Sequence, residues 1–150
     1  MKNKEFLVLG AIMVFGLALV LFFYFYPIKK ENLNVVLANK TFETEVADTV
    51  DLQEKGLSGH VPLLDNQGML FVFKKADTYG FWMKDMTFPI DILWVSEGKK
   101  IVHIERSLTP DSFPKVFYPT GPSLYVFEIS AGQSDLLNLK IGDSVKFINN

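Results

Sequence analysis

The 150-residue chain contains no cysteine, and this absence excludes three kinds of protein. A scaffold stapled by disulfides, a zinc site built from thiolates and a cysteine nucleophile all need that residue. The chain also lacks an excess of basic residues, since its formal net charge is −2 and its pI is about 5.7. Ordinary nucleic-acid-binding domains carry a basic stripe, so we expect no nucleic-acid partner.

The sequence motifs of metal and nucleophile chemistry are missing as well. Only two histidines occur, His60 and His103, and neither belongs to an H-x-x-H or H-E-x-x-H pattern. The G-x-S-x-G, P-loop and dinucleotide fingerprints are also absent from the sequence. The sequence therefore predicts no metal, no cofactor and no assigned catalytic residue.

What the chain does have is one long apolar run at residues 6–26. Every residue in it is hydrophobic except Gly10 and Gly16, and none is charged. As a helix this run would be about 31 Å long, which matches a hydrocarbon core of roughly 30 Å. A cleaved signal peptide has a shorter apolar part that ends in small residues, whereas this run ends in F-F-Y-F-Y. We predict an uncleaved transmembrane helix that acts as a signal anchor in the lipid bilayer.

The charges that flank this run predict its orientation. The amino terminus, Lys2 and Lys4 lie on one side, and Lys29 and Lys30 lie on the other. The first side has the slight positive excess, which places it in the cytoplasm. The expected protein is a single-pass protein of the cytoplasmic membrane, with its C-terminal domain outside at the cell envelope. Its expected parts are a cytoplasmic tail at 1–5, the transmembrane helix at 6–26, a tether at 27–32 and a β-rich soluble domain at 33–150.

The rest of the chain alternates short apolar runs with turn residues, a pattern typical of β-structure. The predicted strands lie at 35–37, 41–46, 68–73, 81–83, 90–95, 100–105, 124–129 and 144–148. A short helix through Lys55 is predicted, with Asp48 or Thr49 as its cap and Gly56 at its C-terminal end, and a second is predicted at 134–139. The four prolines within 109–122 predict a loop. A β-α-β layout would need helices of about 10–15 residues, which the pattern lacks. We therefore predict a mainly β domain with minor α content: a small antiparallel β-sandwich or partly open barrel.

Three stretches of this domain carry a family resemblance. They are K-G-L-S-G-H with G-M-L-F-V-F, then F-W-M-K-D-M-T-F-P-I-D-I-L, then Y-V-F-E-I with A-G and G-D-S-V. In order and spacing they resemble domain-of-unknown-function family 192 across residues 40–148. The resemblance implies a small β-rich domain, often behind a signal or membrane anchor, with no established biochemical role. This chain departs from the family in having His60 where Arg is usual and Asp85 where Asn is usual.

Asp91 is the first candidate for a site, because it lies within an otherwise apolar run. A carboxylate there is costly to bury unless it is hydrogen-bonded or paired. One reading is structural, with Asp91 holding backbone N–H groups or a lysine; the other has Asp91 and Lys84 lining a polar pocket beside Trp82. The two tryptophans, Trp82 and Trp94, are expected in the core, and Trp82 could alternatively be a platform on which a sugar or peptide stacks.

Glu128 is the second acidic candidate, near the end of a predicted strand. Together with Asp91 it could perform acid–base chemistry of the kind used in glycoside hydrolysis, if the two carboxylates converge. His60 is added because it follows a glycine in a predicted loop. The candidate ligand-binding residues are therefore Trp82, Lys84, Asp91, Glu128 and His60.

Three functions remain open at this point. The first is a module at the cell envelope that binds an unknown ligand or protein and does not catalyse a reaction. The second is an envelope glycan hydrolase with paired carboxylates. The third is a structural or assembly module recognised through a flat apolar patch.

Overall fold

The computed structural model describes residues 15–17, 21 and 33–149. Residues 15–17 and 21 are helical, and they belong to a unit separate from the compact domain that begins at Asn32. Within the described ranges, no helix is both long and apolar enough to cross a bilayer.

Three predicted segments lie mostly or wholly outside this description. The predicted transmembrane helix at 6–26 is described at only four positions, and the predicted tail at 1–5 and tether at 27–32 at none. All three stay predictions.

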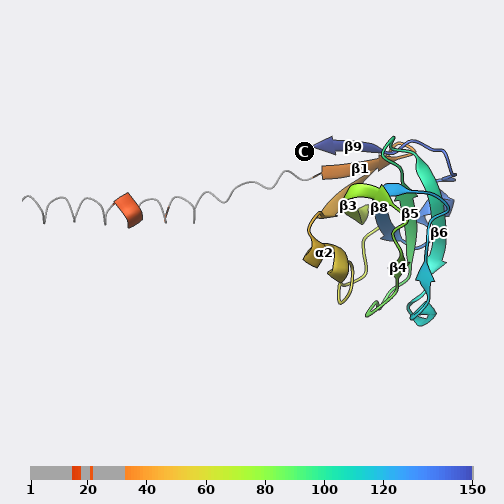
Figure 1. Ribbon diagram of the computed structural model, residues 1–150, viewed down its shortest axis with the longest axis horizontal. Coiled ribbons are helices and arrows are strands. Elements are labelled where there is room, and N and C mark those ends of the chain that lie inside the picture. The colour runs from red at the N-terminus through yellow and green to blue at the C-terminus, as the bar shows by residue number, and fades with distance from the viewer. Residues whose placement is uncertain (1–14, 18–20, 22–32, 150) are drawn as a thin grey trace, which may run out of the picture. The chain divides into compact units, whose positions relative to one another are not determined.

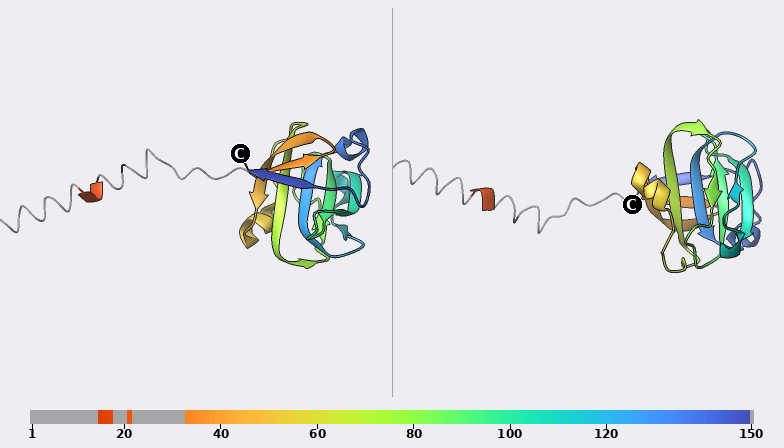
Figure 2. Two further views of the ribbon diagram at one scale, coloured as in Figure 1. Left: turned by 90° about the horizontal axis from the view of Figure 1, so that it is seen from above. Right: turned by 60° about the horizontal axis from the view of Figure 1, so that its bottom comes forward.

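The domain is built around one seven-stranded sheet in the order β6-β5-β8-β3-β2-β1-β9 (Figure 1). The sheet curls around a core without closing, so β6 and β9 are its edges (Figure 2). Every neighbouring pair is antiparallel except β2 and β3, which are parallel. The strands are β1 (Leu33–Leu37), β2 (Lys40–Ala47), β3 (Gln67–Asp77), β5 (Ile90–Val95), β6 (Ile101–Leu108), β8 (Ser123–Ser130) and β9 (Lys146–Asn149).

The remaining elements are short. β4 (Phe81–Trp82) and β7 (Val116–Phe117) form a separate two-stranded sheet. The domain's helices are α2 (Val50–Lys55), the 3-10 helix η1 (Pro110–Ser112) and α3 (Gln133–Leu136). The predicted mainly β domain is confirmed, but two details were wrong. Apart from the β4–β7 pair, the strands form one mixed, open sheet where an antiparallel sandwich or partly open barrel was expected, and the described domain has three short helices where two were expected.

The parallel pair arises from a short crossover that joins β2 to β3 through α2. Thr49 begins the helix, because its hydroxyl accepts a hydrogen bond from the Leu52 N–H at 3.4 Å. Gly56 ends it with a φ of +50°, a conformation that suits glycine. Parallel strands need a connection of about a dozen residues, and the segment from β2 to β3 satisfies that with only one short helix. The expectation that such a crossover needs a long helix was therefore wrong.

The central strands are buried on both faces. Along β8, Val126 contributes to one core cluster while Phe127 and Ile129 contribute to the other. β5 is buried along its whole length, and its apolar residues also alternate between the two core clusters. The first cluster packs beneath α2 and β4, so a side chain on that face of β8 points toward these two elements.

Candidate functional site

A cleft of about 670 Å³ opens between α2 and residues 79–86, which include β4 and which we call the β4 segment. We call this cleft the α2–β4 cleft. Its walls come from α2 and the turn after it, from β3, from the β4 segment and from β8. These elements are labelled in Figure 1. Ligand pockets are commonly about 300–1,000 Å³, so this volume suits a small molecule. The residues that carry its chemistry are Glu54, Lys55, Phe71, Phe73, Tyr79, Phe81, Trp82, Lys84, Asp85 and Glu128.

Glu128 forms the floor of the α2–β4 cleft. It lies in β8 between Met69 of β3 and Ile92 of β5, so it is in the middle of the sheet. Its side chain is only 4% exposed, and its Oε2 has no hydrogen-bond partner among the described residues. Burial raises the pKa of this carboxyl from 4.5 to about 8, so it is mostly protonated at neutral pH.

Aromatic side chains form the walls above Glu128. Phe71 and Phe81 meet edge to face with ring centroids 4.8 Å apart, and Phe73 stacks on Tyr79 at 3.5 Å. Phe81 also meets the buried Trp94 edge to face at 5.9 Å. These contacts fix the rings against one another, and they leave a rigid apolar surface around the acid.

The rim of the cleft is exposed and carries charges of both signs. Trp82 is 49% exposed, and the Lys84 ammonium lies 5.9 Å from the centroid of its ring. Lys55, Glu54 and Asp85 are exposed at the same rim. Two basic and two acidic side chains therefore balance, and the only buried ionisable group that lines the cleft is the carboxyl at its floor.

Two hydrogen bonds tie the walls of the cleft together at one end. The Ser58 hydroxyl donates to the Lys84 carbonyl at 2.8 Å, and the Gly59 N–H donates to the Asp85 carbonyl at 3.1 Å. Asp85 has a φ of +55°, a left-handed conformation that Asn and Asp tolerate better than most residues. The backbone at position 85 can therefore accept either Asp, as in this chain, or Asn, which is usual in the family that the sequence resembles.

The structure brings together three of the five candidate residues. Trp82, Lys84 and Glu128 all line the α2–β4 cleft. His60 follows the turn after α2, where its N–H donates to the Leu57 carbonyl at 3.0 Å, and it does not line the cleft. The expectation that both tryptophans belong to the core was right for Trp94, which is fully buried, and wrong for Trp82.

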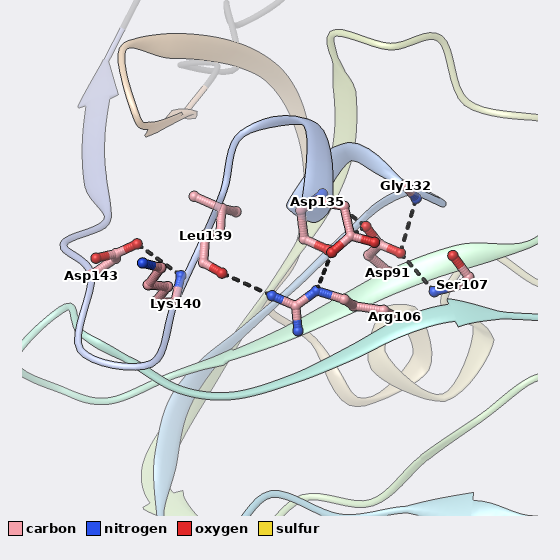
Figure 3. Close-up of polar contacts among 9 residues, drawn as sticks. Asp91, Arg106, Ser107, Gly132, Asp135, Leu139, Lys140 and Asp143 are labelled. Carbon is pink, nitrogen blue, oxygen red and sulfur yellow. Dashed lines mark hydrogen bonds and ion pairs between the residues drawn. The ribbon is translucent and has the colours of Figure 1, made fainter.

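Asp91, the fifth candidate, has a structural environment instead (Figure 3). It is fully buried in β5, and it is not among the residues that line the cleft. One carboxylate oxygen accepts the N–H groups of Ser107 at 2.7 Å and Gly132 at 3.1 Å. The other accepts the N–H and the hydroxyl of Ser134 at 2.8 and 2.6 Å. Asp91 therefore joins β6 and the start of α3 to the central sheet, as its structural reading predicts.

The two acidic candidates also point to opposite faces of the sheet. Glu128 is paired across the strands with Ile92, whereas Asp91 is paired with Ile129. Ile92 packs in the first core cluster and Ile129 in the second. Glycoside hydrolysis needs two carboxyl groups that flank one bond, so this pair does not form such a site.

The aromatic walls and α2 were not among the predicted site residues. Phe71, Phe73 and Phe81 looked like core residues, because their apolar runs predict buried strands. Glu54 and Lys55 lie on a helix far from β4 in sequence. The available signal was the period-two alternation of β8, which puts Glu128 on the same face as Val126.

The arrangement also limits what the cleft could hold. Among residues 33–149 and the few described before them, no three His, Asp or Glu side chains are grouped so as to hold a metal ion. The features that remain are one uncharged carboxyl at neutral pH, aromatic faces and a balanced rim. Chemically, the cleft can donate a hydrogen bond from Glu128 or, once that acid is ionised, pair with a cation.

Comparison with known proteins bears on the identity of the domain. The model of domain-of-unknown-function family 192 (DUF192, described as "Uncharacterized ACR") matches residues 33–147. The search of curated proteins finds no match. Among the solved structures that match, two crystal structures each have a TM-score of 0.71.

The first of these is a protein of unknown function from Novosphingobium aromaticivorans DSM 12444. It is 30% identical, and the match covers 80% of this chain and 89% of that one. The second is described as a putative transcription regulator from Sinorhizobium meliloti 1021. It is 26% identical, and the match covers 78% of this chain and 92% of that one. From the family match over most of its length, this chain belongs to domain-of-unknown-function family 192.

Proposed function

We propose that this protein is a small-molecule-binding module whose ligand site is the α2–β4 cleft. The observation that carries the proposal is Glu128, a buried carboxyl at the floor of the cleft whose Oε2 has no partner. Such a group costs free energy in the folded protein, and a bound ligand that supplies the missing partner would recover part of it. Buried polar groups without partners are rare, so one that lines a cleft is a strong candidate for a binding group.

The exposed Trp82 supports the same proposal. It meets Phe113 edge to face at 5.9 Å and leaves half of its surface open at the rim. An apolar ligand that enters the cleft would cover this ring and gain free energy from the buried area. The exposure of Trp82 supports the hypothesis that it is a platform on which a ligand stacks.

The proposal predicts that small probes change the fluorescence of Trp82. We would titrate the full chain in lipid nanodiscs with phenethylamine, phenethyl alcohol, phenylacetate and N-acetylglucosamine. At least one probe is expected to change the emission saturably, and Trp82→Phe is expected to remove the response because the other tryptophan, Trp94, is fully buried. If no probe gives a saturable change, or if Trp82→Phe leaves the change intact, the cleft is not the ligand site.

We further propose that the domain is anchored outside the cytoplasmic membrane by residues 6–26. The support is the length of the apolar run, its aromatic end and the slight excess of positive charge before it. A binding module placed there would meet ligands of the cell envelope.

This anchoring predicts the outcome of proteolysis on whole cells. Protease added to intact cells is expected to remove the domain, because the chain after residue 32 would lie outside the membrane. The control is the same treatment after the cells are opened, which should degrade a cytoplasmic marker as well. Full protection of the domain in intact cells would mean that it lies in the cytoplasm, opposite to the proposed orientation. Recovery of the protein in the membrane-free fraction would contradict the anchor.

A further inference from the structure

We propose that the α2–β4 cleft is selective for a small organic cation, an amine with an aromatic or apolar body, whose ammonium group pairs with Glu128. This inference rests on the proposed binding function and names the chemical class of the ligand.

The interior of the cleft offers one charge-bearing group, and that group is acidic. The described residues contain no ion pair to Glu128. The β3 and β5 residues beside it, Met69 and Ile92, are apolar. A ligand ammonium at the cleft face of Glu128 would give its carboxyl a charged donor, and hydrogen bonds between charged groups are roughly twice as strong as neutral ones.

The walls favour a cation for an independent reason. The faces of aromatic rings are negative, so a cation held among them is stabilised, and aromatic cages recognise ammonium groups in this way. Trp82 already attracts the Lys84 ammonium at the rim, at 5.9 Å from its ring. Phe71, Phe81 and Tyr79 line the same cleft as Glu128.

The charged side chains at the rim of the cleft do not favour an anionic ligand. The ionisable groups that line the cleft besides Glu128 are Glu54 and Lys55 of α2, Tyr79 before β4, and Lys84 and Asp85 after it. The two lysines are matched by the two acids, and all four are exposed and screened by water. Selectivity is therefore set at the buried floor, where the charge is negative once Glu128 is ionised.

Three probes with the same ring test the inference by calorimetry on the full chain in nanodiscs. We expect phenethylamine to bind at least tenfold more tightly at pH 8 than phenethyl alcohol or phenylacetate. Its affinity should rise about tenfold per pH unit from pH 6 toward pH 8, because Glu128 must lose its proton before it pairs with the ammonium. At pH 7 nearly one proton should be released per amine bound, measured in buffers of different ionisation enthalpy.

Glu128→Gln keeps the size of the side chain but cannot ionise, and it should abolish both the amine preference and the pH dependence. Glu97→Gln is the matched control, since Glu97 is exposed in the turn between β5 and β6 and does not line the cleft. If phenethyl alcohol or phenylacetate binds at Trp82 more tightly than the amine, the cation selectivity is wrong while the binding function stands. If no probe binds, both are wrong. An amine affinity that still rises with pH in Glu128→Gln would also overturn the assignment.

Discussion

Replacing Glu128 with Gln is expected to make the domain progressively more stable than the wild type as the pH rises. The folded-state pKa of Glu128 is about 8, above its ordinary value of 4.5, so the folded state holds a proton that the unfolded state has lost. Between these two pKa values the wild type loses about 1.4 kcal/mol of its free energy of unfolding for each unit by which the pH rises. The stabilisation that Glu128 gives by holding its proton is fully present below about pH 4.5 and is lost above about pH 8. Between pH 5 and pH 8 the difference between the two proteins should change by roughly 4 kcal/mol.

Urea unfolding of both proteins at several pH values measures this difference directly. Other titrating groups cancel in the comparison, because the two chains differ at one buried position. The amide of Gln lacks a partner as well, so a constant offset between the curves is expected and carries no information. Glu97→Gln should run parallel to the wild type at every pH. Parallel curves for Glu128→Gln would mean that Glu128 titrates normally and is not a buried, unpaired acid.

Replacing Asp91 with Ala is expected to destabilise the domain, in contrast to Glu128→Gln. This buried carboxylate accepts four hydrogen bonds, and its removal leaves the donors of Ser107, Gly132 and Ser134 without an acceptor. An unsatisfied buried donor costs about 1–3 kcal/mol, so we expect a loss of more than 3 kcal/mol in the free energy of unfolding. The loss should also loosen α3, whose first N–H groups Asp91 holds.

Asp143→Ala is the control for this loss. Asp143 is exposed and accepts one hydrogen bond, from the Lys140 N–H at 2.8 Å, so its removal should cost less than about 1 kcal/mol (Figure 3). If Asp91→Ala does not fold, Asp91→Asn keeps one acceptor oxygen and allows unfolding to be measured, with a smaller loss. An Asp91 variant as stable as the wild type would contradict the structural role.

Local patterns predicted most of the elements of this domain but not their arrangement. The cap at Thr49, the turn glycine at Gly56 and the period-two runs are short-range signals, and each marks an element that the structure contains. The parallel pairing of β2 with β3 depends on the path of residues 48–66, and no local pattern describes that path. A six-residue helix was enough to make the crossover, because the rest of the connection supplied its length.

The candidate site could likewise be predicted from the sequence only in part. Glu128 and Asp91 are both acids in apolar strands, and the sequence could not tell which would be satisfied. The difference arises from chain segments distant in sequence, since α3 and β6 bring donors to Asp91, while Glu128 shares its cleft with aromatic side chains. Trp82 was expected in the core because aromatic side chains dominate the interiors of β-sandwiches, yet the two-residue strand β4 leaves it at the rim.

The most direct test of the central claim is an NMR titration of the Glu128 side-chain carboxyl in the full chain, with and without phenethylamine. In the free protein the carboxyl should titrate with a pKa of about 8, far above the ordinary value. Saturating amine should lower that pKa, because an ammonium group beside the acid favours its charged form. A free-protein pKa near 4.5, or a raised pKa that phenethylamine leaves unchanged, would contradict the account of Glu128 as a buried, unpaired acid that awaits a cationic ligand.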